Sequence, residues 1–307
     1  MSQPLALQLL HDTRYDYDAA VAISQHLAWL QPLSNQRQLL EQFALEIEPA
    51  PPSLSLERDH FGNLRHRFAL YQPHTYLQVR AQSLITLLPQ ALARPQESIG
   101  WQSLRRQLAY QAGVAVDDAV QFVFASPRIP LLPELQRYAR DCFDAGTTVL
   151  QGAIRLMQRI HGDFLYAPDA TEASTPILQA FHQRAGVCQD FAQIMIGCLR
   201  ALGLPARYVS GYLLTQPAPG CERLVGADAS HAWVSVYCPP LGWVDLDPTN
   251  NLLPQQTHVT LAIGRDFSDV TPLRGVLQGC AGHRLSVAVT LAPLAESALP
   301  APLVATE

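Results

Sequence analysis

The side chain best suited to covalent chemistry in this chain is the thiol of Cys188, in the segment GVCQDFAQIMIGCLRALGLPARYVSGYL. Apolar residues recur after it at three- and four-residue steps, which predicts a helix that begins at the cysteine. Gly203 is typical of the position just beyond a helix, and Pro205 prevents the helix from continuing. Gly186 gives the chain freedom to turn sharply into the helix. The predicted inward face comprises Cys188, Phe191, Met195, Leu199 and Leu202.

A thiol in the first turn of a helix can serve two roles. Free backbone N–H groups and the positive end of the helix dipole stabilise an anion, and they can lower a cysteine pKa from about 8.5 to roughly 3.5–7.5. The same N–H groups can hold the oxyanion of a tetrahedral intermediate. The alternative is a small buried hydrophobic residue at a helix start, which is the commoner fate of a lone cysteine. The helix by itself supports both roles of Cys188 equally.

A histidine and an aspartate stand in the next patterned segment, DASHAWVSVYCPPLGWVDLDPTNN, which spans residues 228–251. Two antiparallel strands are predicted, with residues 238–240 as their loop and His231 directly opposite Asp247. In this register the two side chains lie on the same face of the sheet. The aspartate would accept a hydrogen bond from one imidazole nitrogen and leave the other nitrogen to pair with a thiol.

Each of these two residues also has a simpler explanation. His231 could be a satisfied histidine at the start of a strand, and Asp247 before Pro248 could serve only the turn. A cysteine at a helix start, followed by histidine and aspartate on neighbouring strands, makes coincidence the weaker explanation. The sequence therefore predicts a catalytic triad of Cys188, His231 and Asp247.

The composition restricts the class of protein and its partners. The 307 residues are 48% hydrophobic and 15% charged, with a net charge of −5, which is typical of a soluble globular protein and argues against nucleic acid or an anionic membrane as the main partner. The sequence shows no signal peptide and no apolar run of about 18 residues, so a cytoplasmic location is expected. The six cysteines form no CxxC pair and no paired Cys/His spacing. We therefore expect reduced thiols, without a disulfide framework or a structural zinc site.

The chain is expected to divide into four regions. Residues 1–90 contain short β-type segments separated by Pro, Asn and Gly, and DHFGN at 59–63 is predicted to be a hairpin turn. Residues 91–148 are rich in Ala, Gln and Pro and are interpreted as connecting structure that is partly helical. Residues 149–292 contain the helix and strands around the triad. The Ala/Pro-rich tail, 293–307, is predicted to be disordered.

Four motifs around the triad carry a family resemblance: GVCQDFA, LRALGLPARYVSGYL, SHAW and GWVDLDPTN. As a set they resemble the transglutaminase-like superfamily, whose core is similar to that of papain-type cysteine proteases. HDTRYDYDAAVAISQHL and DHFGN resemble the β-rich N-terminal domain of bacterial transglutaminase-like proteins, and AIGRDFSDVTPLRGV (262–276) resembles a segment that follows the core. The resemblance implies an α+β protein, with a β-rich N-terminal domain before a papain-like core in which the Cys188 helix packs against an antiparallel sheet.

The resemblance also implies a reaction. Cys188 falls on the family nucleophile, His231 on its general base and Asp247 on the carboxylate that orients the histidine. The thiolate would attack an amide of a peptide or protein, His231 would protonate the departing amine, and a primary amine or water would take the acyl group from the thioester. No metal or cofactor is expected, because the calcium ligands of the animal enzymes have no visible counterpart. Tyr166 and Gln189 are further candidates for a pocket wall or an oxyanion donor, with ordinary packing as the alternative.

Three functions are compatible with this sequence. The first is cysteine-dependent acyl transfer at amide bonds, by transamidation or hydrolysis. The second is a peptidase or amidase that uses only water as the acceptor. The third is a protein-binding module that retains the fold without the chemistry. The intact set of Cys188, His231 and Asp247 favours the enzymes over the binding module.

Several other polar residues and thiols receive simpler interpretations. Arg265, Asp266 and Asp269, in GRDFSD, could line a cleft, but solvated charges at a turn are the favoured interpretation. Cys198 is predicted to be an inert core thiol, and Cys221 an exposed one.

Overall fold

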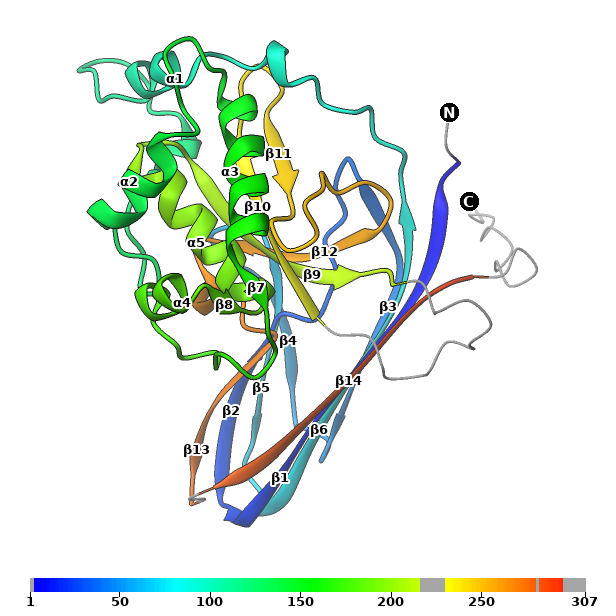
Figure 1. Cartoon of the computed structure of the whole chain (residues 1–307). Helices are drawn as coiled ribbons and strands as arrows, with labels where there is room; N and C mark the ends of the chain where they lie inside the picture. The colour runs from blue at the N-terminus through cyan, green and yellow to red at the C-terminus, as the bar shows by residue number, and fades with distance from the viewer. Residues whose placement is uncertain (1–2, 216–229, 280–281, 295–307) are drawn as a thin grey trace, which may run out of the picture.

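The computed structural model of the chain describes residues 3–215, 230–279 and 282–294 (Figure 1). Long strands form the lower part of the molecule in this view, and helices cover a second group of strands in the upper part. Among the described residues, three four-stranded antiparallel sheets and one short parallel pair are formed. None of the described helices is long and apolar enough to cross a membrane.

The lower part is a sandwich of two sheets. Their strand orders are β14-β1-β6-β3 and β13-β2-β5-β4. Alternation along each strand turns one set of side chains inward, and both sheets contribute to one buried cluster, with Tyr17 and Val79 from the first sheet and Phe68 and Leu70 from the second. The strands are β1 (Leu5–Val21), β2 (Ile23–Ala28), β3 (Gln38–Glu48), β4 (Leu54–Arg58), β5 (Leu64–Leu70), β6 (His74–Leu87), β13 (Leu273–Gln278) and β14 (His283–Pro293).

Two strands of the sandwich come from the far end of the chain. β14 pairs with β1, and β13 pairs with β2. Residues 273–292 are expected from the sequence to belong to the core, whereas their strand pairing joins them to the sheets of the N-terminal strands. The sequence of a strand does not show which sheet it enters, because period-two alternation is common to all of them. Residues 295–307 of the predicted tail lie outside the described residues.

The motif DHFGN forms the predicted hairpin turn, between β4 and β5. Gly62 has a φ of +86°, which favours glycine. The Asp59 carboxylate accepts hydrogen bonds from the backbone N–H groups of Phe61 and Asn63, both at 2.9 Å. The Asn63 side chain reaches β12 (His258–Gly264), where it donates to the Ile263 carbonyl and accepts from the Ile263 N–H, each at 2.7 Å. The hairpin therefore also attaches the sandwich to the upper sheet.

The upper part is built around helix α5 (Cys188–Ala201), which packs on a sheet of strand order β11-β10-β9-β12. Every residue from 189 to 200 is buried, because further helices cover the side of α5 that faces away from the sheet. This arrangement confirms the predicted α+β fold. The other elements of this part are η1 (Pro95–Glu97), α1 (Trp101–Gln107), η2 (Asp118–Val123), α2 (Pro133–Arg140), α3 (Val149–Asp163), β7 (Leu165–Tyr166), α4 (Ile177–Gln183), β8 (Ala185–Gly186), β9 (Ala206–Leu213), β10 (Ser230–Tyr237), β11 (Trp243–Leu246) and η3 (Phe267–Asp269).

The C-terminal end of α5 forms as the sequence predicts. Gly203 has a φ of +77°, and its N–H donates to the Arg200 carbonyl at 2.8 Å. The Leu204 N–H donates to the Leu199 carbonyl at 3.0 Å. This pair of bonds is the Schellman motif, which satisfies carbonyls that the helix end would leave free.

The predicted register of the two triad strands is wrong by two residues. Tyr237 pairs with Trp243 and Ser235 with Asp245, so the loop spans residues 238–242 and His231 lies beyond the end of β11. The Cys238 N–H donates to the Gly242 carbonyl at 2.7 Å and closes this longer loop. A shift of two residues keeps every side chain on its predicted face.

A further buried cluster joins the sandwich to the upper sheet, with Leu9 of β1, Tyr212 of β9 and Leu261 of β12 among its members. His11 lies at this junction, where its Nδ1 is 2.7 Å from the Tyr212 hydroxyl and its Nε2 is 2.8 Å from Thr13 Oγ1. Burial lowers the pKa of His11 to about 4. The histidine is therefore held neutral between two hydroxyl groups.

Acid is expected to weaken this junction. Because the pKa of His11 in the folded protein is about 4 and the unfolded value is about 6.5, its contribution is fully present above pH ~6.5 and is lost as the pH falls through 4. The free energy of unfolding in urea should be measured from pH 7.5 to pH 4 for the wild type and for His11→Gln. The free energy of unfolding of the wild type should exceed that of His11→Gln by less as the pH falls. A gap between the two free energies that does not change with pH would contradict this role of His11.

Candidate active site

The first turn of α5 is organised by the carboxylate of Asp190. Asp190 Oδ2 accepts hydrogen bonds from the backbone N–H of Val187 at 2.9 Å and from Thr171 Oγ1 at 2.6 Å. A Cβ atom at Gly186 would lie 2.5 Å from the same oxygen, so glycine is needed there for space. The prediction that Gly186 serves a sharp turn is wrong, since its φ is not positive. This arrangement places Cys188, partly exposed, as the first residue of the helix.

His231, near the start of β10, connects the thiol to the aspartate. Its Nε2 lies 2.7 Å from Asp247 Oδ2, and the ring also forms a hydrogen bond with Cys188. Burial alone would lower the pKa of His231, but the hydrogen bonds to Asp247 and Cys188 raise it to about 9. The structure therefore brings together the three side chains that the sequence singles out, in the order Cys188, His231, Asp247.

Asp247 is fully buried and is surrounded by donors. Its Oδ2 accepts from His231 Nε2 at 2.7 Å, from His258 Nε2 at 3.0 Å and from Asn250 Nδ2 at 2.7 Å. Its Oδ1 accepts from the backbone N–H groups of Thr249 at 3.0 Å and Asn250 at 3.2 Å. Burial alone would raise the pKa of Asp247, but the hydrogen bonds from His231 and His258 hold it well below its usual range. The carboxylate is therefore a fixed negative charge.

His258, the first residue of β12, is a member of this site that the sequence analysis did not identify. Burial lowers the pKa of His258, although Asp247 acts in the opposite direction. Its Nδ1 lies 2.9 Å from Thr257 Oγ1. Since a carboxylate can only accept, His258 must carry its proton on Nε2. The available signal in the sequence was a histidine at the start of the strand-like run HVTLAIG, shortly after the triad aspartate.

His231, Asp247 and His258 also form the one group of potential metal ligands found among the described residues, with ligand atoms within 4.8 Å of one another. Both histidines direct Nε2 at the same carboxylate oxygen, at 2.7 and 3.0 Å. A metal would need both nitrogens deprotonated and turned toward it. The observed contacts are those of a hydrogen-bonded cluster rather than of a metal centre.

An indole ring supports the two histidines from one side. Trp233 is fully buried; its ring is stacked on His231 at 6.1 Å between centroids and meets the edge of His258 at 5.1 Å. The indole extends over Gly211 on the neighbouring strand, where a Cβ would lie 2.6 Å from the Trp233 ring and 2.0 Å from the Val259 carbonyl oxygen. Glycine is therefore the residue that lets Trp233 lie flat beside His231.

A Gly211→Ala substitution is expected to damage both the fold and the site. The new methyl group would overlap a backbone carbonyl and the indole, neither of which can move away without displacing β12 or His231. We expect a loss of stability of about 2–4 kcal/mol, as for strong overpacking. Chemical denaturation should measure it, with Gly162→Ala as a control, because a Cβ at Gly162 meets no atom within 4 Å. Equal stability of the two variants would contradict the packing argument.

The two further candidates from the sequence have different surroundings. Tyr166 is 53% exposed on β7, which pairs with the strand that leads into Cys188. Burial and the charge of Cys188 both raise the pKa of Tyr166, so its hydroxyl lies within electrostatic reach of the sulfur. Gln189 is buried, and its side-chain amide donates to the Ala173 carbonyl at 3.2 Å. The Gln189 side chain thus holds the segment before α4.

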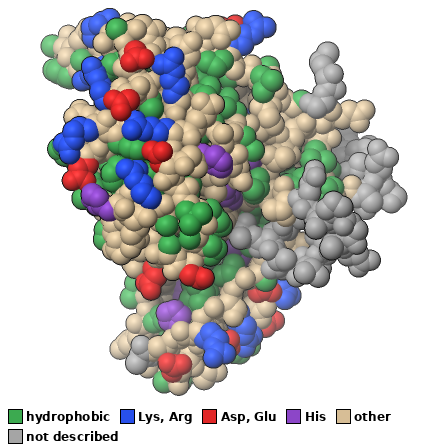
Figure 2. Space-filling view, in the orientation of Figure 1, with side chains coloured by type: hydrophobic (Ala, Val, Ile, Leu, Met, Phe, Trp, Pro, Cys, Tyr) green, Lys and Arg blue, Asp and Glu red, His purple; other side chains and the backbone are tan. Residues whose placement is uncertain are grey.

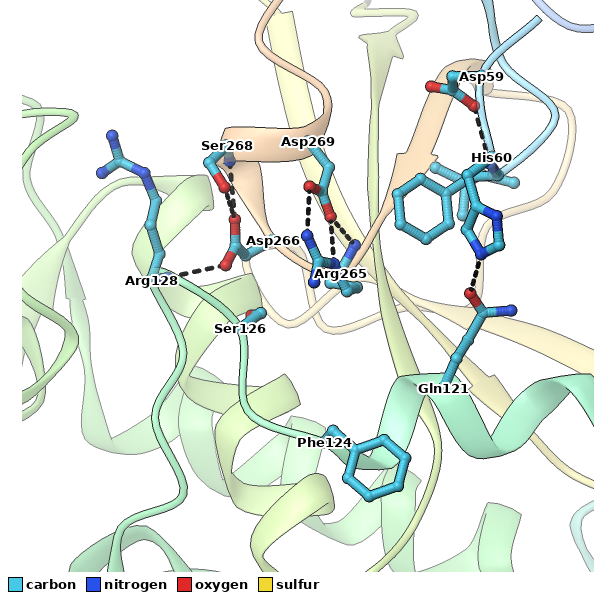
Figure 3. Close-up of polar contacts among 12 residues, drawn as sticks. Asp59, His60, Gln121, Phe124, Ser126, Arg128, Arg265, Asp266, Ser268 and Asp269 are labelled. Carbon is cyan, nitrogen blue, oxygen red and sulfur yellow. Dashed lines mark hydrogen bonds and ion pairs between the residues drawn. The ribbon is translucent and has the colours of Figure 1, made fainter.

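The segment before α4 is also held from the other side by the motif GRDFSD. Asp266 is fully buried and accepts from the Arg128 backbone N–H at 2.8 Å and from Ser268 (Figure 3). The Arg128 guanidinium in turn donates to the same Ala173 carbonyl that Gln189 contacts. The interpretation of Asp266 as a solvated charge at a turn is therefore wrong, because this carboxylate is buried and positions Arg128, which holds the segment before α4.

The remaining thiols differ from Cys188 in exposure. Cys198 is fully buried, and burial raises its pKa, in keeping with the predicted core thiol. Cys142 and Cys238 are also buried. Cys221, predicted to be exposed, lies outside the described residues. Among the thiols that the structure describes, Cys188 is the only one that is not buried.

Comparison with known proteins identifies relatives along most of the chain. An uncharacterized protein from Mycobacterium tuberculosis is 35% identical over 274 residues, which cover 88% of this chain and 87% of the relative. An uncharacterized protein from Mycobacterium leprae is 30% identical over 292 residues, 94% of this chain and 99% of the relative. The protein-glutamine gamma-glutamyltransferase of Pseudomonas aeruginosa is 39% identical over 105 residues, only 33% of this chain and 16% of that protein.

One solved structure has a similar fold, and two family models match parts of this chain. A protein from Cytophaga hutchinsonii, described as a candidate cysteine protease, has a similar fold, with a TM-score of 0.73 at 20% identity over 97% of this chain and 94% of that one. The model of the bacterial transglutaminase-like N-terminal region matches residues 7–86, and that of the transglutaminase-like superfamily matches residues 136–248. The chain therefore belongs to the transglutaminase-like superfamily and carries a bacterial transglutaminase-like N-terminal region.

Proposed function

We propose that this protein is a cysteine acyltransferase that acts on amide bonds of peptides or proteins through a thioester on Cys188. The observation that carries the proposal is the position of His231, which is hydrogen-bonded to Cys188 on one side and to the buried Asp247 carboxylate on the other. A histidine raised to a pKa of about 9 is protonated at neutral pH and can supply the proton that a leaving amine needs.

In the first half-reaction, the Cys188 thiolate attacks the carbonyl carbon and the carbonyl oxygen becomes an oxyanion. The backbone N–H groups of Cys188 and Gln189, the first two residues of α5, precede the helical hydrogen bonds and can stabilise this charge. When the intermediate collapses, the C–N bond breaks and the departing nitrogen takes the proton from His231. The products of this step are a thioester and a free amine or ammonia.

In the second half-reaction, a primary amine or water attacks the thioester carbon. The now neutral His231 accepts the proton of the attacking group, the C–S bond breaks and the thiolate is restored. Asp247 remains ionised throughout and stabilises the imidazolium form, as its fixed charge and its five hydrogen bonds require.

Hydrolysis is the second candidate, and the exposure of the site supports it. Cys188 is itself partly exposed, and its neighbours Tyr166 and Leu165 are 53% and 69% exposed. An open site admits water to the thioester, whereas transamidation needs the site to favour amine over water. The similarity to a protein-glutamine gamma-glutamyltransferase, over 33% of this chain, supports glutamine side chains as the first acyl donors to test.

The experiment is a mass-spectrometric screen of glutamine-containing peptides and unfolded proteins, with and without an added primary amine. Transfer predicts products that have lost ammonia and gained the amine, while hydrolysis predicts deamidated or cleaved products under both conditions. A Cys188→Ala variant serves as the blank. If no substrate reacts and an acyl-donor probe labels wild type and variant equally, the acyltransferase proposal fails and a binding module becomes the better account.

A further inference from the structure

A large cavity lies between the sandwich and the upper sheet, on the side of β9 and β11 that faces away from α5. Its volume is about 1140 Å³, and segments 33–37 and 90–97 form its outer wall. The second of these belongs to the connection that runs from β6 over the upper part to α1 in Figure 1. The cavity is as large as sites that hold small organic molecules.

The charge of the lining is opposite to that of the chain as a whole. Four arginines, Arg37, Arg58, Arg94 and Arg207, line the cavity against two carboxylates, Asp245 and Glu97. On the face shown in Figure 2, blue and red side chains are instead interspersed over the helices. A cationic cavity in a protein of net charge −5 favours an anionic occupant.

Three of these arginines already have acceptors. Arg94 forms an ion pair with Glu97 at 3.1 Å, and the Arg58 guanidinium donates to the Gly62 carbonyl at 2.8 Å. Arg37 lies 3.5 Å from Asp245 and donates to the Pro254 carbonyl. The fourth, Arg207, is therefore the group that distinguishes the cavity.

Arg207 has no hydrogen bond or ion pair with another described residue. Its guanidinium lies over the Trp243 ring, 4.2 Å from the centroid, and its Nε is closed off from solvent without an acceptor. Ser235, its neighbour across β10, is fully buried and its Oγ also lacks a partner. Burial lowers the pKa of Arg207 to about 10, so it remains charged. An arginine fork without an acceptor is costly, and a carboxylate or phosphate matches it in two parallel bonds.

We propose that this cavity is a binding site for an organic anion, whose carboxylate or phosphate group pairs with Arg207 beside Arg37 while its apolar body lies against Leu33, Leu92 and Leu241. Trp243 fixes the plane of the guanidinium, and Asp245 limits how much negative charge the site accepts. The ligand is not held by Cys188 or His231, so the site is independent of the proposed acyl transfer.

The arrangement of β10 separates this site from the triad. Ser235, beside Arg207, lies four residues from His231, which is about 13 Å along an extended strand. The buried indole of Trp233 lies between them on the same face. The alternative explanation is that Arg207 only packs on Trp243, as an arginine with an apolar stem does. That explanation predicts no anion affinity.

Isothermal titration calorimetry on the full chain should test the proposal with hexanoate, hexyl phosphate and the neutral hexanamide. Both anions, or one of them, should bind and hexanamide should not; which anion binds more tightly identifies the head group. Arg207→Met retains the stem on Trp243 and removes the fork, and should weaken anion binding at least tenfold. Arg105→Met should have no effect, since Arg105 stacks on Trp101 outside the cavity.

Asp245→Asn provides a test of opposite sign that does not depend on the folding of the Arg207 variant. Removing this carboxylate frees Arg37 and Arg207 from their internal counter-charge, so anions should bind more tightly. Circular dichroism should confirm the fold of each variant. Failure of both anions to bind better than hexanamide, or equal affinity in the wild type and a folded Arg207→Met, would overturn the proposal without affecting the acyltransferase assignment.

Discussion

A Cys188→Ala variant is expected to lose amide turnover by at least about a thousandfold, because no other group at the start of α5 can form the thioester. The change removes one sulfur atom from a partly exposed position, so the fold should survive. The measurement is the rate with one confirmed amide substrate, together with circular dichroism. Cys198→Ala is a matched control, since it removes a thiol from the same helix at a buried position and should retain most of the activity.

A substitution of His231 tests whether Cys188 and His231 act together. His231→Ala should be as severe as Cys188→Ala, because the leaving amine then has no proton donor. The double variant should be hardly slower than either single one, since groups that act as a unit are not additive. Near-normal activity in a folded Cys188→Ala protein would refute the thioester mechanism, and additive losses would show that the two residues act independently.

The parts of this molecule that could be predicted are those with local causes. The helix from Cys188 to Gly203 depends on apolar spacing and on a glycine that tolerates a positive φ, and both are written in consecutive residues. The common face of His231 and Asp247 follows from the period of two in a strand. The hairpin at DHFGN follows from turn chemistry at Asp59 and Gly62.

The parts that could not be predicted depend on residues distant in sequence. The register of β10 and β11 was open to a shift of two, because faces are unchanged by it and the closing bond from Cys238 to Gly242 is visible only in the folded loop. His258 reaches the site because β12 lies beside β9. The sequence of β12 alone shows neither where this strand lies nor which strand it pairs with. The pairing of β14 with β1 could not be predicted for the same reason, because the two strands are distant in sequence.

The structure also changes the reasons given for two residues. Gly186 is needed because the Asp190 carboxylate occupies the space that a side chain at position 186 would take. The conformational freedom of glycine, which is all that the sequence suggests, does not reveal this contact. Asp266 is buried and bonded to Arg128, although its neighbours Arg265 and Asp269 form a more exposed ion pair at 2.9 Å. The charged run GRDFSD therefore contains one structural carboxylate, that of Asp266. Only its partners in the folded protein distinguish it from the more exposed Asp269.

Asp247→Asn is the substitution expected to have the largest effect outside the thiol and the general base. Donors occupy both oxygens of Asp247: three side-chain donors face Oδ2, and two backbone N–H groups face Oδ1. An asparagine amide has one oxygen and one NH₂ group, so either orientation directs N–H bonds against donors. Each such unsatisfied contact costs about 1–3 kcal/mol. We expect lower stability and a rate reduced by about 10²-fold, which is milder than the loss of at least about a thousandfold in Cys188→Ala.

The dependence of kcat on pH distinguishes the loss of the Asp247 charge from misfolding of the variant. The negative charge of Asp247 helps to raise the pKa of His231 to about 9, so wild-type activity should fall as the pH rises through that value and the imidazolium is lost. Without the charge, His231 should lose its proton at lower pH, and the basic limb of kcat against pH should move toward neutrality. His258→Leu keeps the Asp247 charge and removes one donor, so its limb should stay near that of the wild type while its rate falls only modestly. A basic limb that is unchanged in folded Asp247→Asn would show that the carboxylate does not set the charge of His231.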